Sequence, residues 1–407
     1  MSSPPIAARQ SPLGWARRNL FRSRWDAAVT VVAAVLVGYA VVRAVRFVFV
    51  TGRWEIVRVN LKLLMVGRFP DQHLLRVSVA VVVAAGVGGL VAGCLHRRQA
   101  DAGRLVWRPP GAVWAIRAFV ARSWPLLLVT LLVLSLTSTP GPWVTAGAAL
   151  AALVVARLLG TRLPKQLHAV IFVGAALAPF LLVWYLADAV GWDGWGGLML
   201  NVFIAVTSIV LCFPLGVLAA LGRRSSMPVV RGLSTVTIEL VRGAPLFVLL
   251  LMANVALGFF VPPDQAPGRV ARAIVVFTIF TAAYLAEIVR GGLQSLPPGQ
   301  EEAAKALGLS PVRVTFLVVL PQALRNVIPA QVGQFISLFK DTTLAGAAMT
   351  LFELLQVGQS VTAQGPFAGQ ALLPEAFAFV GLLFWTGAYT MSRESQRLER
   401  RLGVGQR

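Results

Sequence analysis

The sequence has few of the residues that disulfide frameworks and metal sites require. Among its 407 residues there are only two cysteines, Cys94 and Cys212, and each lies inside an apolar run. Two such cysteines do not indicate a disulfide framework, and Cys94 with His96 has no second pair of ligands nearby. The other two histidines, His73 and His168, stand alone. We therefore predict no metal site in this chain.

The motifs of several common enzyme classes are missing as well. The sequence contains no G-x-x-x-x-G-K-[ST] phosphate-binding loop, no H-E-x-x-H helix and no C-x-x-C pair. Without the phosphate-binding loop, the chain cannot hold the phosphates of ATP by that route. We expect a non-catalytic chain that has no catalytic, cofactor-binding or metal-binding residues of its own.

Charged residues make up only 13% of the sequence, whereas 57% of the residues are hydrophobic. This composition lies outside the range of soluble globular domains and indicates an integral membrane protein. The 37 basic and 16 acidic residues give a net charge of +21. Because the arginines lie mostly in short loops between apolar runs, the positive-inside rule accounts for this charge better than nucleic-acid binding does.

Ten apolar runs have about the length of 20 residues that a helix needs to cross a bilayer. They cover residues 27–50, 76–95, 124–137, 142–159, 168–190, 198–221, 245–261, 270–291, 327–351 and 375–391. The predicted fold is therefore an all-α integral membrane protein with about ten transmembrane helices. A basic N-terminal segment and a basic C-terminal tail place both termini in the cytoplasm.

We divide the chain into four parts. Residues 1–26 form a basic cytoplasmic N-terminus, and residues 27–194 form an N-terminal transmembrane extension of about five spans. In this extension, charged and apolar residues alternate over 54–66, which predicts an interfacial helix. Residues 195–395 form a five-span core, and residues 396–407 form a cytoplasmic tail. No internal repeat relates the first five spans to the last five.

Residues 297–321, PPGQEEAAKALGLSPVRVTFLVVLP, are neither strongly apolar nor a simple turn. Two prolines and then two glutamates open the stretch, as is typical of the first turn of a helix. Gly308 can adopt the left-handed conformation that ends a helix, and Ser310 with Pro311 can start another one. The stretch therefore predicts a helix, a sharp turn and a second helix.

One face of the first predicted helix carries small residues. Ala303, Ala304 and Leu307 are spaced by three and four residues, so we expect them to share a face that another protein can approach closely. The alternative is an ordinary amphipathic cytoplasmic hairpin without a partner.

The same stretch resembles a known family. Glu302-Ala303-Ala304 is followed after three residues by Gly308, and after nine more by Val318, one residue and Leu320-Pro321. This pattern resembles the cytoplasmic coupling loop of permease subunits of bacterial ATP-binding-cassette (ABC) importers, with valine at position 318 in place of the usual isoleucine. The residues that the resemblance assigns to coupling with the ATPase subunit are Glu302, Ala303, Ala304, Leu307, Gly308, Leu320 and Pro321.

Other segments narrow this resemblance. Residues 239–245, 284–292 and 338–344 are similar to motifs of the polar amino acid permeases, the branch that includes histidine, glutamate, glutamine, arginine and opine importers. Residues 59–70, VNLKLLMVGRFP, are similar to a segment of the long subunits of general L-amino acid importers or of importers for glutamate, glutamine, aspartate and asparagine.

The resemblance implies a permease subunit of the bacterial inner membrane that moves polar amino acids into the cytoplasm. Its core would be the five-helix permease core of ABC importers. ATP and Mg would be bound by a partner ATPase subunit and not by this chain. The other implied partners are a second permease subunit, which could be a copy of this chain, and an extracytoplasmic amino-acid-binding protein.

Two other functions are compatible with parts of the sequence. A secondary amino acid transporter driven by an ion gradient would need paired discontinuous helices in two related halves, which the sequence does not indicate. A membrane-anchored nucleic-acid-binding or lipid-binding protein would need a soluble basic domain, for which the loops are too short.

Two groups of charged residues lie at membrane depth, where each charge is costly unless it is paired or faces water. Glu287 and Arg290 are three residues apart on one predicted helix, so they can pair with each other or with Glu239 and Arg242. We expect structural ion pairs that hold the inner ends of the spans together.

Lys340, Asp341, Thr342 and Thr343 form the second group, near the middle of the span predicted at residues 327–351. Neighbouring positions on a helix point about 100° apart, so Lys340 and Asp341 cannot simply neutralise each other. They either line a polar path for a zwitterionic substrate or form an ion pair between spans at a subunit interface, and the sequence leaves both hypotheses open.

Overall fold

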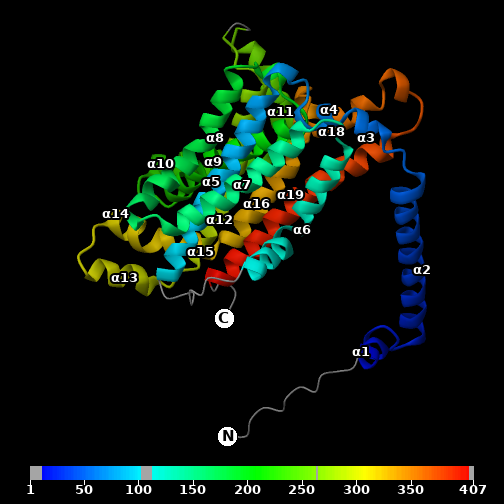
Figure 1. Cartoon of the computed structure of the whole chain (residues 1–407). Coiled ribbons are helices and arrows are strands. Elements are labelled where there is room, and N and C mark those ends of the chain that lie inside the picture. Colours follow the sequence, from blue (N-terminus) through cyan, green and yellow to red (C-terminus); the bar gives the residue numbers. More distant parts are fainter. Residues whose placement is uncertain (1–11, 102–111, 263–264, 403–407) are drawn as a thin grey trace. The chain divides into compact units, whose positions relative to one another are not determined.

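The computed structural model describes residues 12–101, 112–262 and 265–402 (Figure 1). Helices make up nearly all regular structure, and no β-strand forms among the described residues. The chain separates into two compact units, Met1–Trp54 and Glu55–Arg407. The ends of the predicted N-terminal segment, residues 1–11, and of the predicted tail, residues 403–407, lie outside the described residues.

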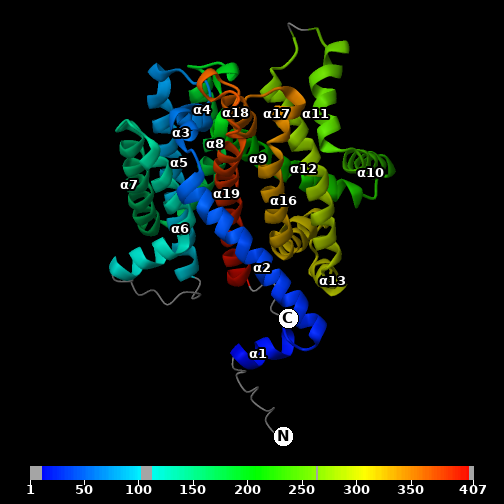
Figure 2. The same cartoon turned by 90° about the vertical axis from the view of Figure 1, so that its right-hand side faces the viewer.

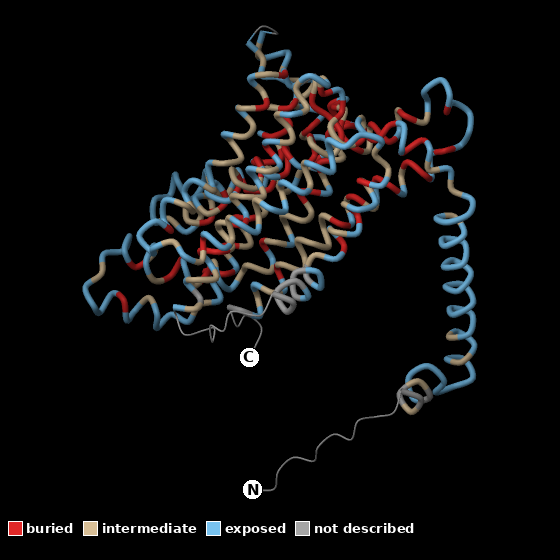
Figure 3. The backbone as a smooth tube through the Cα atoms, in the orientation of Figure 1, coloured by how far each residue is buried: buried red, intermediate tan, exposed pale blue. Residues whose placement is uncertain are grey.

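The described part of the first unit consists of α1 (Pro12–Asn19) and α2 (Arg24–Arg46), which continues into a π-helical turn at Phe47–Thr51. Ser23 begins α2 with a capping box: its hydroxyl accepts the N–H of Asp26 at 3.0 Å, and the Asp26 carboxylate accepts the N–H of Ser23 at 3.1 Å. None of the residues of α2 is buried (Figure 3). A mostly apolar helix of this length is what the span predicted at residues 27–50 requires.

The second unit contains two groups of helices. Those of the extension are α3 (Glu55–Val59), α4 (Leu61–Val66), α5 (Leu74–Asp101), α6 (Ala112–Leu136), α7 (Gly141–Arg162) and α8 (His168–Ala187). Those of the core are α9 (Gly197–Arg223), α10 (Pro228–Gly243), α11 (Leu246–Val255), α12 (Arg269–Gln294), α13 (Pro298–Ala306), α14 (Pro311–Arg313), α15 (Leu320–Asn326), α16 (Ile328–Asp341), α17 (Leu344–Met349), α18 (Leu354–Val361) and α19 (Leu373–Leu402).

The core is organised around α9 and α12, two long helices that pack along each other and run in the same direction (Figure 2). Helix α10 packs on both of them, and α16 packs against α19. In both views α13 lies at one end of the bundle, and α4 and α18 lie at the opposite end (Figures 1 and 2). We refer to these two ends as the α13 end and the α18 end.

Helices α3 and α4 replace the single interfacial helix predicted at residues 54–66. The chain bends at Asn60, whose side-chain amide donates to the carbonyl oxygen of Ile56 at 2.9 Å. Ile56 and Leu64 are fully buried, because α3 packs against α19 and α4 packs against α9 and α18. The apolar residues of this segment therefore contact the core and not the lipid headgroups.

Within the described residues, six helices are long and apolar enough to cross a membrane, or eight if each of two bent pairs counts as one span. The bent pairs are α10 with α11, at 99°, and residues 311–326 with α16, at 62°. The predicted number of ten spans therefore stays a prediction. Both bends lie in the core, and the described part of the extension has no equivalent of them.

The prediction of one continuous span over residues 327–351 is wrong. Helix α16 ends at Asp341, α17 begins at Leu344, and Thr350 has a left-handed backbone with φ of 55°. At the break, the Thr342 hydroxyl donates to the carbonyl oxygen of Phe339 at 2.7 Å, and the Thr343 hydroxyl donates to that of Lys340 at 2.9 Å. Such hydrogen bonds from threonine compete with the helical pattern and favour a bend.

Helices α5 and α7 approach each other closely at two glycines. A Cβ added to Gly89 would lie 2.3 Å from the carbonyl oxygen of Leu153, and one added to Gly93 would lie 2.3 Å from that of Arg157. The two glycines are four residues apart and therefore lie on one face of α5. They form the small-xxx-small pattern that lets the backbones of membrane helices meet.

We expect Gly89→Leu and Gly93→Leu to destabilise the chain, because the new side chains cannot fit between α5 and α7. Overpacking of this kind costs about 1–3 kcal/mol. Gly88→Leu is the matched control, since a Cβ at Gly88 meets no atom within 4 Å. Thermal unfolding of the purified protein in detergent tests this expectation, and equal melting temperatures for all three variants would contradict it.

Candidate functional site

Residues 297–321 form a helix-turn-helix at the α13 end of the bundle (Figure 1). Helix α13 ends in a Schellman motif. The N–H of Gly308 donates to the carbonyl oxygen of Lys305 at 2.9 Å, and the N–H of Leu309 donates to that of Ala304 at 3.3 Å. Gly308 has φ of 77°, a conformation in which a side chain is strained. Pro311 then starts the next helix, which continues through a π-helical segment, Val314–Val319, into α15.

An ion pair reinforces α13. Lys305 Nζ lies 2.9 Å from the Glu301 carboxylate one helical turn earlier. The hydrogen bond from Lys305 lowers the pKa of Glu301, and the charge of Arg224 contributes in the same direction. Glu301 therefore stays ionised in the first turn of α13, where negative charge suits the helix dipole.

The structure corrects the predicted small-residue face of α13. Ala304 is only 4% exposed and packs with Val314 and Val319 of the following segment, whereas Leu307 is 82% exposed. Ala303 is also exposed. Neighbouring positions on a helix point about 100° apart, so Ala303 and Ala304 cannot both face outward once the second helix covers one side of α13.

The other residues assigned to coupling are likewise partly exposed and partly buried. Glu302, Gly308 and Pro321 are exposed, whereas Leu320 is buried in the apolar cluster beneath α13. The exposed set, which we call the coupling face, is therefore Glu302, Ala303, Leu307, Gly308 and Pro321. Ala304 and Leu320 instead join the helix-turn-helix to the core.

An apolar cluster joins the helix-turn-helix to three core helices. It contains Ala304, Val314, Val319 and Leu320 from the helix-turn-helix, Ala220 from α9, Ile238 from α10, and Leu285, Val289 and Leu293 from α12. At Gly292 on α12, an added Cβ would lie 2.8 Å from the carbonyl oxygen of Ala323 on α15. This close packing makes the helix-turn-helix a continuation of the core.

A group of five charged side chains, which we call the Glu287 cluster, ties the same three core helices together. The Glu287 carboxylate of α12 lies 2.5 Å from an Arg223 nitrogen of α9 and 2.8 Å from an Arg290 nitrogen of its own helix. Arg242 of α10 approaches it to 3.8 Å, and its guanidinium lies over the Tyr284 ring. Arg223 also binds Glu239 of α10 at 2.9 Å.

The four charged residues singled out in the sequence thus lie together, but a fifth residue connects them. Arg223 contacts both Glu239 and Glu287, and it was not among the predicted ion pairs. Its place at the end of a long apolar run is the only signal that the sequence offered. Which of two nearby arginines reaches a carboxylate depends on how the helices pack, and local spacing does not determine it.

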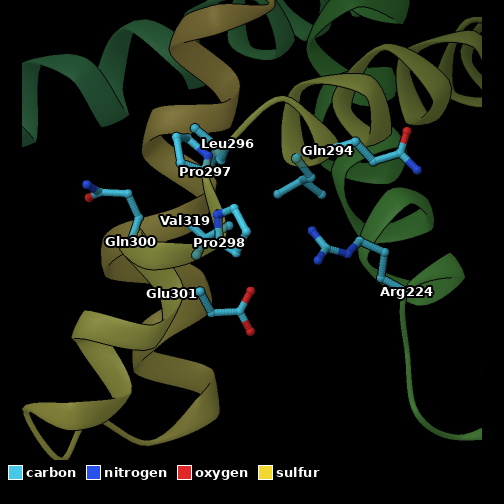
Figure 4. Close-up of a pocket in the computed structure, with 9 residues that line it drawn as sticks. Arg224, Gln294, Leu296, Pro297, Pro298, Gln300, Glu301 and Val319 are labelled. Carbon is cyan, nitrogen blue, oxygen red and sulfur yellow. The ribbon is translucent and has the colours of Figure 1, made fainter.

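A cavity of ≈ 190 Å³ lies at the base of α13 (Figure 4). Arg224, directly after α9, and Glu301 of α13 lie on two sides of it, and Gln294, Pro297 and Pro298 also line it. The cavity lies where the end of α12 meets the start of α13. It contains no buried charged group that would hold a ligand.

The second group of predicted residues lies at the break after α16. Lys340 is exposed and Asp341 is half-buried, and neither forms an ion pair with another described residue. Thr343 bonds to the Lys340 carbonyl oxygen. Thr342 is fully buried and accepts a hydrogen bond from Asn201, so in this structure its side chain faces the protein interior. Lys340 and Asp341 therefore lie at the end of a helix and not in the middle of one.

Two buried polar residues near this break were not predicted as site residues. Asn201 on α9 and Glu353 before α18 are 0% and 1% exposed, and they bond to each other at 3.1 Å. A carboxylate between two apolar runs was the available signal, but its partner lies 152 residues away in sequence.

Comparison with known proteins places this geometry in a family. Residues 212–403 match the family of binding-protein-dependent transport system inner membrane components. The probable glutamine ABC transporter permease protein GlnP of Bacillus subtilis is 37% identical over 207 residues, which cover 50% of this chain and 91% of that protein. The chain belongs to this family. It is accordingly a multi-pass inner membrane protein, and the family match covers most of the predicted core.

The chain matches only part of two other relatives. The glutamate/glutamine/aspartate/asparagine transport system permease protein BztC of Rhodobacter capsulatus is 41% identical over 269 residues, which cover 62% of each chain. The inner membrane amino-acid ABC transporter permease protein YhdY of Escherichia coli is 43% identical over 232 residues, which cover 55% of this chain and 62% of that protein. The chain thus matches about three fifths of the length of each.

We expect Glu287→Gln to destabilise the chain strongly, because it leaves Arg223, Arg242 and Arg290 close together with only Glu239 to balance them. Removing one partner from a buried ion pair costs about 3 kcal/mol. The matched control is Glu239→Gln, since the Glu239 side chain is 54% exposed and contacts only Arg223 among the described arginines. A solvated pair of this kind contributes less than about 1 kcal/mol.

The measurement is thermal unfolding of both variants in detergent, together with the yield of folded protein. A clearly lower melting temperature for Glu287→Gln than for Glu239→Gln is the expected result. Equal values would show that the Glu287 cluster does not hold the three helices together.

Proposed function

We propose that this chain is the membrane subunit of an ABC importer for polar amino acids. The observation that carries the proposal is the helix-turn-helix at the α13 end, which has an exposed coupling face and an interior continuous with α9, α10 and α12. A partner that holds the coupling face can move the core helices, because close packing leaves no slack between them. The names of the relatives BztC and YhdY support amino acids as the substrate class.

In this proposal the partner subunit binds ATP and Mg and hydrolyses the nucleotide. Its surface takes up the coupling face through apolar contact with Leu307 and close approach to Ala303. When two such subunits close on ATP, they displace both helix-turn-helices, and the apolar cluster and the Glu287 cluster pass the displacement to the spans. A second permease subunit and an extracytoplasmic binding protein complete the importer.

The proposal also orients the chain. The α13 end faces the cytoplasm, where the ATPase lies, and the α18 end faces outward. An even number of spans then leaves both termini in the cytoplasm, in agreement with the basic residues near each end.

Glutamate, glutamine, aspartate and asparagine are the proposed substrates. Each carries an α-carboxylate and an α-ammonium, and both need a counter-charge or a dipole once water is removed. Lys340 and Asp341, which have no ion pair within the described chain, supply one charge of each sign at the break after α16. We propose that they line the substrate path, with Thr343 beside them.

Uptake into proteoliposomes tests the function. We expect uptake of radiolabelled glutamine or glutamate to require ATP, the ATPase subunit and the binding protein, and to persist when ion gradients are dissipated with ionophores. Uptake that needs no ATP and collapses with the gradient would replace this proposal with a secondary transporter.

The same preparation tests coupling. Gly308→Val should leave the complex assembled but abolish stimulation of ATP hydrolysis by the loaded binding protein, because a β-branched residue at a φ of 77° costs roughly 1–3 kcal/mol and distorts the turn. Gly299→Val is the matched control: Gly299 lies on α13 without a neighbour within 4 Å of its Cβ position. Normal stimulation in Gly308→Val would contradict the proposed role of the turn.

The substrate path is tested with Lys340→Met, Asp341→Asn and the double variant. If the two residues serve the substrate, each single variant should lose at least about tenfold in uptake, equivalent to about 1.4 kcal/mol, while the ATPase subunit still co-purifies. If they instead form an ion pair between subunits, the single variants should lose the complex and the double variant should recover it. Recovery of the complex only in the double variant would reject the path.

A further inference from the structure

A buried polar cluster lies close to the break after α16, at the end of the bundle opposite α13 (Figure 2). Asn201 of α9, Thr342 at the break and Glu353 before α18 are 0%, 0% and 1% exposed. In these three residues, which we call the Asn201 cluster, Asn201 lies 141 residues before Thr342 and 152 residues before Glu353 in the sequence. Buried polar groups are costly unless their hydrogen bonds are satisfied, so the partners of each group decide whether this cluster is stable.

Both polar atoms of the Asn201 side chain have hydrogen-bond partners. Its side-chain nitrogen donates to the Thr342 hydroxyl at 2.9 Å and to the Glu353 carboxylate at 3.1 Å, and its side-chain oxygen accepts the N–H of Leu354 at 2.9 Å. Thr342 in turn donates to the carbonyl oxygen of Phe339. Asn201 therefore connects the end of α16 to the start of α18.

Glu353 is held in place by neutral donors. Its carboxylate accepts the N–H groups of Leu355 and Gln356, at 2.9 Å and 2.8 Å, in addition to Asn201. No lysine or arginine of the described chain forms an ion pair with it. The carboxylate caps the N-terminus of α18, where the free N–H groups and the helix dipole favour negative charge.

Close contacts with the backbone also join the segments around Glu353. The N–H of Gly197, one turn before Asn201, donates to the carbonyl oxygen of Phe352 at 2.9 Å. An added Cβ at Gly346 on α17 would lie 2.5 Å from a Glu353 carboxylate oxygen. The carboxylate therefore fills the space beside α17, so that α9, α17 and α18 are all set against one side chain.

We propose that Asn201 and Glu353 are positioning residues that fix the direction of Lys340 and Asp341 by holding Thr342. The inference rests on the proposed function, because it takes Lys340 and Asp341 as lining the substrate path. Thr342 directly follows Asp341, and among the described residues Asn201 is the only side chain that forms a hydrogen bond with it. Without this bond, Thr342 at the end of α16 is no longer held to α9. The two charged side chains before Thr342 then lose their fixed position relative to α9.

The test exchanges the amide of Asn201 and the carboxylate of Glu353 between the two positions. Asn201→Asp removes the donor to Thr342 and places a second carboxylate 3.1 Å from Glu353. Glu353→Gln keeps the size of the side chain and removes its charge. In the double variant, the glutamine amide and the Thr342 hydroxyl can each donate to the aspartate, so both contacts of position 201 are restored with the roles reversed. This double-mutant cycle isolates the interaction between the two residues.

Uptake kinetics provide the first measurement, made on the assembled complex and normalised to the amount of co-purifying ATPase subunit. We expect Asn201→Asp to raise KM about tenfold, equivalent to about 1.4 kcal/mol, and the double variant to recover most of the loss. Glu353→Gln introduces no repulsion between like charges and should raise KM less. This variant keeps the test decisive if Asn201→Asp fails to assemble. An unchanged KM in Glu353→Gln and in every assembled variant would overturn the proposal.

A second measurement does not depend on transport. With Lys340→Cys as the reporter, the rate of labelling by a soluble thiol reagent follows the direction of position 340, since Cys94 and Cys212 are buried. We expect Asn201→Asp to change this rate severalfold and the double exchange to restore it. If the wild-type complex imports no amino acid but the labelling result holds, the proposed function fails while the positioning role of the cluster stands. An unchanged labelling rate overturns the positioning role, whatever the uptake.

Discussion

The carboxylate of Glu287 is the group on which the α13 half of the core depends. It is the shared partner of arginines from α9, α10 and α12, and only 15% of its side chain is exposed. Three guanidinium groups cannot lie this close together without an anion between them. The position of Glu287 thus determines how the three helices meet, and their meeting point is the platform on which the helix-turn-helix is packed.

Helix α9 extends this platform to the other end of the bundle. Its last residue, Arg223, belongs to the Glu287 cluster, and Asn201, near its first turn, holds Thr342 at the end of α16. A helix of 27 residues is about 40 Å long and resists bending much more than a loop does. A displacement at the coupling face can therefore reach the proposed substrate path along one continuous element, and the two buried polar clusters fix its ends.

Local sequence features allowed part of this structure to be predicted. The turn at Gly308 follows from the glycine and the serine-proline pair after it, and the spans follow from runs of apolar residues. The break at Thr342 could not be found in this way, because residues 327–351 contain no glycine-proline pair and the charged pair Lys340-Asp341 was compatible with a continuous span. The burial of Ala304 and the contact of Asn201 with Glu353 depend on which helices become neighbours, and this is decided by packing across the whole core.

We infer that the coupling face docks on an ATPase. A photoreactive amino acid in place of Leu307 tests this inference most directly. After irradiation of intact cells, we predict a cross-linked protein that contains the G-x-x-x-x-G-K-[ST] loop, whereas the same probe at the exposed Arg231 of α10 should not capture that protein. Cross-links from position 307 only to lipid, or to proteins without that loop, in cells that still take up the substrate would contradict the account.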